Sequence, residues 1–294
     1  MNANFKLTLS MIIFGTIGVF RRYIPLPSSL VAMSRGLTGM LFLLLVMRLR
    51  KSGMNRSAVR RKLGMLCLSG AAIGVNWILL FEAYNYTSVA TATLCYYLAP
   101  MFVILASPLV VGERLTAKKL VCVLAALLGM VFVSGVLESG GGSSDLKGVL
   151  LGLGAAVLYA SVVLMNKQLG DVPAYDRTIV QLGSSAAVLL PYVLLTEDVG
   201  ALTFTPATLA LLLVVGIVHT GIAYAMYFGS LMQLKAQTAA ILSYIDPVVA
   251  VLLSALLLKE RMSLLSGLGA VLVLGAAVVS ELPVPRRRAK MKES

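Results

Sequence analysis

One stretch of this chain occurs twice, and it constrains the fold more than any other feature. Residues 91–114 read TATLCYYLAPMFVILASPLVVGER, and residues 238–261 read TAAILSYIDPVVAVLLSALLLKER. The two copies align without a gap and share a Thr-Ala start, a tyrosine, a proline and a Glu-Arg end. Both are apolar runs that proline interrupts near the middle. A proline-interrupted membrane segment present in both halves of a chain is typical of a transporter's substrate site.

The composition places most of the chain in lipid. Of 294 residues, 59% are hydrophobic and only 13% are charged, and the mean hydropathy is +0.93. A soluble domain of this size would not cover so much apolar surface. Because a bilayer-spanning helix needs about 20 apolar residues, the sequence predicts an all-α membrane protein with ten spans. We expect these near 5–24, 29–48, 63–83, 88–110, 118–137, 147–166, 177–195, 207–230, 236–258 and 263–282.

The basic residues predict how the chain lies across the membrane. The formal net charge is +13. If the N-terminus is cytoplasmic, 19 of the 25 Lys and Arg residues lie inside, five lie outside, and Arg35 lies within a span. This asymmetry predicts that both termini are cytoplasmic. We therefore interpret the charge as a topology signal that meets anionic lipid heads, and we expect no nucleic-acid partner.

The chain divides into two halves of five spans. We expect a first repeat at residues 1–138, a Gly/Ser-rich linker at 139–146, a second repeat at 147–283 and a basic cytoplasmic tail at 284–294. Because each half has an odd number of spans, the second must enter the membrane with the opposite orientation. The sequence therefore predicts an inverted repeat, which can open a central site to each side in turn.

These motifs resemble a known family. A five-span unit that ends in Pro-x12-Glu-Arg and occurs twice is similar to the EamA-type ten-span exporters of the drug/metabolite transporter superfamily. Pro100 with Glu113-Arg114 and Pro247 with Glu260-Arg261 carry the resemblance. Phe14-Gly15 is similar to the aromatic-glycine pair of the first span, whereas Tyr159-Ala160 departs from it in the second half.

The resemblance implies a bacterial inner-membrane transporter without a cofactor that exports small metabolites. Amino acids are the expected substrates, since the chain looks most like bacterial exporters of amino acids, including the aromatic type. An exporter of cationic drugs or toxic compounds is the alternative. A membrane-embedded enzyme is a third hypothesis, although we find no phosphate loop, nucleophile-base set or metal-ligand spacing in the sequence. We expect a monomer to be sufficient for activity.

Three residues of the repeated stretch are candidates for the site. Pro100 and Pro247 should kink their helices, because proline removes one amide donor and clashes with the carbonyl four residues back. Asp246 lies about ten residues into its span. A carboxylate at that depth is costly unless it is paired, protonated or hydrated. It is therefore a candidate site for a proton, a cation or a substrate ammonium group, or else a structural hydrogen-bonding group.

Three further ionisable residues are candidates for coupling or gating. His219 is the only histidine and lies near the middle of span 8, where it would serve as a proton relay or as a structural donor. Arg35 lies about six residues into span 2. It would either snorkel toward the surface or bind a substrate carboxylate. Glu82 closes span 3 near the outer face, as a solvated rim charge or as part of a gate.

Aromatic side chains are the expected wall of the pocket. Trp77 and Phe81 lie on one face of span 3, with Tyr224 and Phe228 as the related pair on span 8. Pockets for small organic solutes are mostly apolar with a few polar anchors. For a single aromatic residue, core or lipid packing is the favoured interpretation. The predicted substrate-binding set is Asn76, Trp77, Tyr97, His219, Tyr224, Tyr244 and Asp246.

Overall fold

The fold is all-helical over the part of the chain that the structure describes. The structure is a computed structural model, and it describes residues 2–110, 112, 115–133, 137, 143–231, 233–234 and 242–282. Three features of the sequence analysis lie outside these residues: Glu113-Arg114, the first half of the Gly/Ser-rich linker (139–142), and the tail at 284–294.

The first half contains five helical segments. The first is α1 (Ala3–Gly15) with α2 (Ile17–Arg22), and the second is α3 (Ser28–Leu49). A short surface helix, α4 (Arg56–Arg61), leads into the third, α5 (Leu63–Tyr86). The fourth is α6 (Val89–Tyr96) with α7 (Ala99–Val110), and the fifth is α8 (Ala117–Val133). These agree with the first five predicted spans to within a few residues.

The second half repeats this order. Segment 6 is α10 (Ser143–Gln168) and segment 7 is α11 (Ala174–Thr196). A single 3-10 turn, η1 (Val199–Ala201), precedes segment 8, which consists of α12 (Pro206–Leu213), the π-helix η2 (Val214–Ile222) and α13 (Ala223–Leu231). Segment 9 is α15 (Ile245–Leu256), and segment 10 is α16 (Leu264–Glu281).

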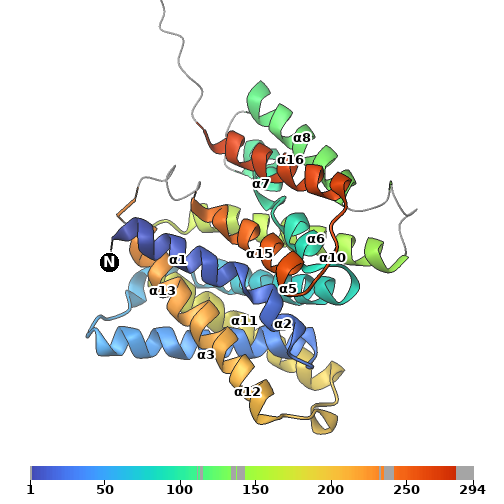
Figure 1. Ribbon diagram of the computed structural model, residues 1–294. Coiled ribbons are helices and arrows are strands. Elements are labelled where there is room, and N and C mark those ends of the chain that lie inside the picture. The colour runs from blue at the N-terminus through green and yellow to red at the C-terminus, as the bar shows by residue number, and fades with distance from the viewer. Residues whose placement is uncertain are drawn as a thin grey trace, which may run out of the picture.

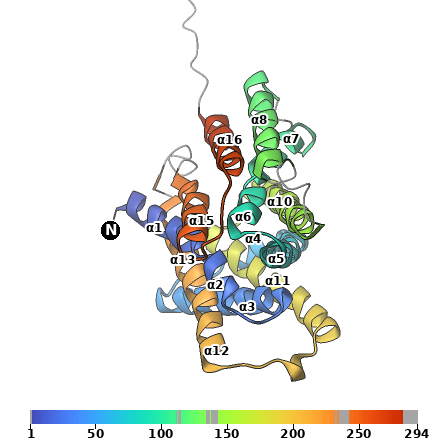
Figure 2. The ribbon, with the colours of Figure 1, turned by 45° about the vertical axis from the view of Figure 1, so that its right-hand side comes forward.

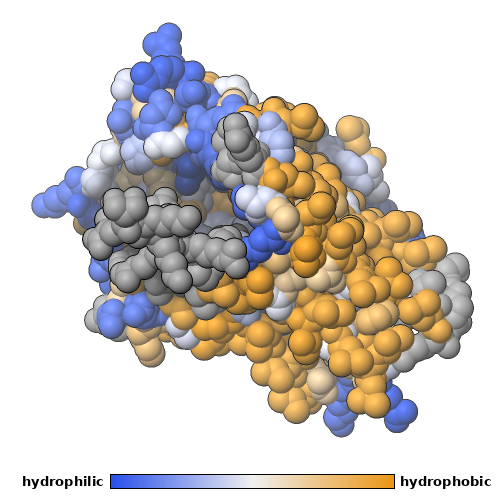
Figure 3. Space-filling view, turned by 90° about the horizontal axis from the view of Figure 1, so that it is seen from above, coloured by the Kyte–Doolittle hydropathy of each residue, from blue (hydrophilic) through white to orange (hydrophobic). Residues whose placement is uncertain are grey.

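The surface of the molecule suits lipid. Seven of the helical segments are long and apolar enough to cross a membrane, and Ile245–Leu256 and Leu264–Ser280 are shorter apolar helices. Figure 3 shows a broad hydrophobic surface, with hydrophilic atoms gathered toward the edges of the view. Two apolar side chains, Leu109 and Leu264, are each 91% exposed. Such exposure would be unfavourable in water and is what a hydrocarbon solvent permits.

The helix contacts are two-fold symmetric. Segment 1 packs on segments 8 and 9 through α1, and segment 6 packs in the same way on segments 3 and 4 through α10. Segment 2 packs on segment 8, as segment 7 packs on segment 3. Segments 2 and 7 pack on each other, as do segments 4 and 9. Segments 5 and 10, represented by α8 and α16, lie side by side at one edge of the bundle (Figures 1 and 2).

Polar contacts at the helix ends show that the repeats are inverted. At one face, Lys147 at the start of α10 donates to the Tyr86 hydroxyl at the end of α5, over 2.7 Å. At the other face, Arg61 just before α5 pairs with Asp171 just after α10. Segments 3 and 6 therefore run antiparallel, and segment 6 starts at the face where segments 1 and 3 end. We call the two faces the Glu260 face and the Asp171 face.

Candidate functional site

Two interrupted helices cross at the centre of the bundle. Segment 4 breaks between Tyr96 and Ala99, and Pro100 is the second residue of α7. Pro247 is the third residue of α15. In the first turn of a helix the amide has no intrahelical acceptor, so proline is tolerated there. The chain is thus interrupted just before Pro100 rather than kinked around it, and each proline lies in the first turn of the helix that follows.

Asp246 joins the two interrupted segments. The Tyr97 hydroxyl, at the C-terminal end of α6, donates a hydrogen bond to the Asp246 Oδ2. Asp246 lies in the first turn of α15, where the helix dipole favours a carboxylate. Segment 1 packs tightly behind it, because a Cβ atom on Gly15 would lie 2.6 Å from the Asp246 carbonyl oxygen. The structure therefore brings Tyr97 and Asp246 of the predicted set together.

Arg35 points into the bundle and does not snorkel to the surface. It is 6% exposed. Its guanidinium carbon lies 4.1 Å from the Trp77 ring centroid and 5.8 Å from that of Phe81. Its Nε donates to the Thr220 Oγ1 over 2.8 Å. Among the residues that the structure describes, the cation–π contacts and this hydrogen bond leave the other guanidinium donors available to a ligand.

Arg35 and Asp246 share one electrostatic environment. The two side chains interact electrostatically with each other, and both interact electrostatically with the hydroxyls of Tyr96 and Tyr224. Within the described residues, no ion pair joins the two charges. The site therefore offers one positive and one negative anchor that do not neutralise each other by direct contact.

Aromatic rings surround these anchors from both halves. The Tyr96 ring lies 5.2 Å from that of Tyr159, and the Phe14 ring lies 5.4 Å from that of Tyr224. Tyr224 also contacts Phe228, with ring centroids 5.8 Å apart. Tyr159 is 40% exposed although it lies within α10. The aromatic wall, predicted on segments 3 and 8, is thus joined by rings of segments 1, 4 and 6.

The remaining predicted residues hold helices together. His219 is 1% exposed, and its Nε2 lies 2.8 Å from the Thr16 Oγ1 at the break between α1 and α2. The Asn76 amide donates to the Ala155 carbonyl of segment 6 over 2.5 Å. Tyr244 directly precedes α15 and packs partly buried against the core around segments 4, 5 and 10. These three residues border the site and support the helices that form it.

Glu82 belongs to a network at the Glu260 face. It accepts hydrogen bonds from the Ser28 hydroxyl over 2.7 Å and from the Asn85 amide over 3.1 Å. Arg21 donates to the same Ser28 hydroxyl over 2.9 Å. Glu82 is therefore part-buried and bonded to segment 2, rather than a free solvated charge.

Sequence reasoning missed the π-helix η2. Its wide turns place two side chains against carbonyls five residues back: the Thr220 hydroxyl donates to Val215, and His219 Nδ1 lies 3.3 Å from the Val214 oxygen. π-Helices are rare and occur frequently at functional sites. The only signals in the sequence were the polar His219-Thr220 pair between glycines at 216 and 221.

The two halves supply matching walls but unmatched charges. At the offset of 147 residues, Trp77 corresponds to Tyr224, and Phe81 to Phe228. Asp246 corresponds to Ala99 at the same offset. Arg35 occupies the place that Gln181 has in segment 7, where Gln181 donates to Ser69 and Asn166. The charges are thus the element that breaks the two-fold symmetry of the site.

A lipid-facing bundle of two inverted repeats around a central polar and aromatic site defines a multi-pass membrane transporter. The sequence model of the EamA-like transporter family matches residues 1–135 and again residues 146–281. The chain belongs to this family.

Several curated proteins are similar to it. Uncharacterized transporter YxxF of Bacillus subtilis (strain 168) is 29% identical over 97% of this chain and 90% of its own length. Protein PecM of Dickeya dadantii is 27% identical over 78% of this chain and 77% of its own length. Protein RarD of Streptomyces exfoliatus is 31% identical over 74% of this chain and 68% of its own length.

A solved crystal structure shares the fold. It superposes with a TM-score of 0.69 at 20% sequence identity and covers 95% of this chain and 96% of its own. The similarity therefore extends over both halves of the bundle.

Proposed function

We propose that this protein exports amino acids across the bacterial inner membrane by alternating access. The observation that carries the proposal is the pair of opposite charges, Arg35 and Asp246, in a site whose walls are aromatic. An amino acid has an ammonium group for Asp246, a carboxylate for Arg35 and a side chain for the rings. Guanidinium binds carboxylate through two parallel hydrogen bonds, which suits Arg35 to the second anchor.

Tyr97 gives this binding mode a defined exchange. Its hydroxyl donates a hydrogen bond to the Asp246 Oδ2, the atom to which a substrate ammonium group would donate. Binding therefore replaces a neutral donor with a charged one, and a hydrogen bond between two charged groups is the stronger of the two. Because the Tyr97–Asp246 bond joins segments 4 and 9, its replacement also changes a contact between the two halves.

The inverted repeats supply the transport step. Two halves with the same helix order and opposite orientation can exchange conformations, which exposes a central site first to one face and then to the other. The basic-residue asymmetry supports a cytoplasmic Asp171 face and an outer Glu260 face.

A decisive test compares three ligands that share one ring. Proteoliposomes would be assayed for saturable transport of labelled phenylalanine, of phenethylamine, which lacks the carboxylate, and of 3-phenylpropionate, which lacks the ammonium group. The proposal expects only phenylalanine to move. Arg35→Gln should lower its transport about tenfold or more, since hydrogen bonds to a charged group contribute about 1.5–3 kcal/mol. Arg61→Gln at the Asp171 face is the matched control and should transport normally.

Export of cationic compounds is the second candidate. Asp246 and the ring of Tyr224 would suit an organic cation through charge pairing and cation–π contact. In that case phenethylamine moves, phenylalanine does not, and loss of the Arg35 charge raises cation transport by removing a like charge. This pattern would replace the amino-acid proposal.

A further inference from the structure

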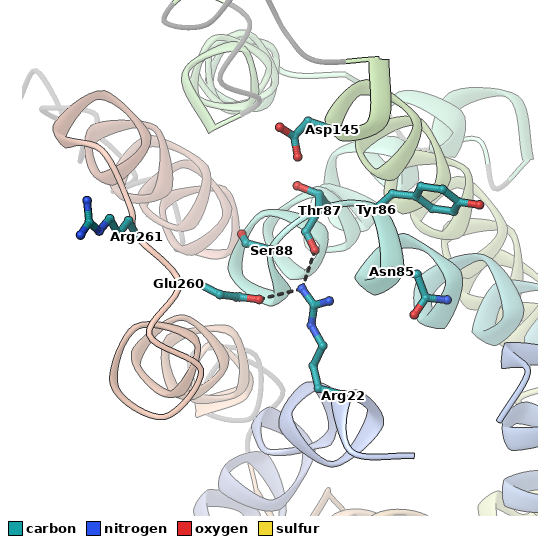
Figure 4. A pocket seen from close by; sticks show the side chains of 8 residues that line it. All are labelled: Arg22, Asn85, Tyr86, Thr87, Ser88, Asp145, Glu260 and Arg261. Carbon is teal, nitrogen blue, oxygen red and sulfur yellow. Dashed lines mark hydrogen bonds and ion pairs between the residues drawn. The ribbon is translucent and has the colours of Figure 1, made fainter. Parts of the chain in front are cut away.

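An ion pair joins three segments at the Glu260 face. The Arg22 Nη2 lies 2.7 Å from the Glu260 Oε1 and also donates to the Thr87 carbonyl over 3.0 Å. Figure 4 shows both bonds converging on the same nitrogen. Arg22 ends α2, Thr87 precedes α6, and Glu260 follows α15. The pair thus connects segments 1, 4 and 9 at one point.

Glu260 is held on both of its oxygens. Its Oε2 accepts from the backbone amide of Val89, at the start of α6, over 2.9 Å, and from the Ser254 hydroxyl. The Glu260 side chain is 17% exposed, whereas the partners in the Arg61–Asp171 pair are 67% and 43% exposed. A pair that is shielded and carries charge-assisted hydrogen bonds is stronger than an exposed one.

Segments 1 and 4 pack closely together next to this pair. The Val89 side chain is fully buried, and its Cγ1 lies 2.3 Å from where a Cβ atom on Gly18 would be, so segments 1 and 4 are in close contact. Two residues before Arg22, the Phe20 ring packs edge-on against His219 at 4.8 Å. On the other side of the pair lies an open pocket of about 350 Å³, lined by Arg22, Asn85, Tyr86, Thr87, Ser88, Asp145, Glu260 and Arg261 (Figure 4).

We infer that the Arg22–Glu260 pair is the latch of a gate that separates the central site from the pocket at the Glu260 face. The position of the gate follows from the contacts of Arg22 and Glu260. Its role in transport rests on the proposed function. Asp246 is in the first turn of α15 and Glu260 follows the last turn, so a rigid helix of about 18 Å connects the site to the latch. A ligand that binds Asp246 therefore pulls on the helix that leads to Glu260. Movement of this helix breaks the Arg22–Glu260 pair and opens the gate toward the pocket.

The test measures access without a substrate. Phe20→Cys, in a background where Cys67 is replaced by serine, reports from between the latch and His219. Asn85→Cys marks the Glu260 face, and Ser57→Cys marks the Asp171 face, since both positions are exposed. A membrane-impermeant maleimide applied from the side where Asn85→Cys reacts should label the Phe20→Cys thiol slowly when the latch is intact. Arg22→Gln and Glu260→Gln should each raise that rate about tenfold, the effect of losing a charged hydrogen bond.

Three comparisons make the result decisive. Arg22→Gln leaves the Glu260 contact with the Val89 amide in place, so faster labelling in this variant assigns the effect to the ion pair and not to helix capping. Arg22→Lys keeps the charge and should return the rate most of the way to the parent value. Asp171→Asn breaks the exposed pair and should leave it unchanged. Parental labelling rates in both Arg22→Gln and Glu260→Gln would overturn the latch, whatever the ligand assay shows.

Discussion

At the scale of single residues, the site depends on a carboxylate that the sequence places at membrane depth. Asp246 could be recognised as a candidate because a charge within an apolar span is energetically costly and is kept mainly where it has a partner or a function. Its partner Tyr97 is 149 residues away in the sequence. Their contact follows from the crossing of segments 4 and 9, which no local pattern encodes. The same is true of Arg35, whose stacking on Trp77 rules out the surface position and leaves carboxylate binding as the proposal.

We expect Asp246→Asn to lower transport about tenfold or more without lowering the melting temperature. The amide keeps an acceptor for Tyr97 but loses the charge that would hold a substrate ammonium group, and a buried charge without a full partner is itself destabilising. Transport in proteoliposomes and thermal unfolding in detergent would be measured on the same preparation. Asp171→Asn is the control. A variant that loses stability in parallel with transport would indicate a structural role for Asp246 instead.

Tyr97→Phe removes the other half of this contact and should act in the opposite sense on binding. The phenyl ring keeps the packing against Tyr96 but frees the Asp246 oxygen, so a substrate ammonium group no longer has to displace a donor. We expect KM for an amino acid to fall several-fold while the maximal rate changes little. An increase in KM would show that the Tyr97 hydroxyl contacts the substrate directly.

At the scale of elements, the apolar runs predicted the segments well and their interruptions less well. Span positions agree with the helices because about 20 apolar residues leave few alternatives in a membrane. The interruption before Pro100 could be located because proline acts locally. The break at Thr16 and the π-helix η2 could not be located, because contacts across the bundle stabilise both. The Thr16 hydroxyl hydrogen-bonds His219, and the Thr220 hydroxyl accepts a hydrogen bond from Arg35.

Gly15 provides a test of how closely segment 1 supports segment 9. A methyl group there would approach the Asp246 carbonyl oxygen and the Val249 side chain, at 2.6 and 2.7 Å from the new Cβ. Gly15→Ala should therefore destabilise the fold by about 1–3 kcal/mol, the usual effect of overpacking. Gly267→Ala in α16 meets nothing within 4 Å. It should be neutral or slightly stabilising, since alanine suits a helix better than glycine. Equal melting temperatures for the two variants would contradict this packing.

At the scale of the whole molecule, the charge distribution and the inverted repeat constrain each other. Five segments in each half require the halves to enter from opposite faces, and the polar contacts at the helix ends show that they do. If the Asp171 face is cytoplasmic, the 19 basic residues that the predicted spans place together, out of 25, satisfy the positive-inside asymmetry.

This assignment predicts which positions react in intact cells. In the Cys67→Ser background, Asn85→Cys should react with an impermeant maleimide before the cells are opened, and Ser57→Cys only afterwards. A reporter fused to the C-terminus should be active only in the cytoplasm. The reverse labelling pattern would invert the topology and place the Glu260 face in the cytoplasm.

The unmatched charges have a consequence for how such a site arises. Two identical halves placed around a two-fold axis would present either two arginines or two carboxylates, and a ligand with opposite ends would have no preferred orientation between them. Once the halves are joined in one chain they diverge independently, and here one half holds Arg35 and the other Asp246. Exchanging Ala99 for a charged residue would alter the charges of the site without changing the helix order of either half. A shared helix order thus leaves the proposed exchange of conformations unchanged, while a few substitutions in one half suffice to change which ligand is bound.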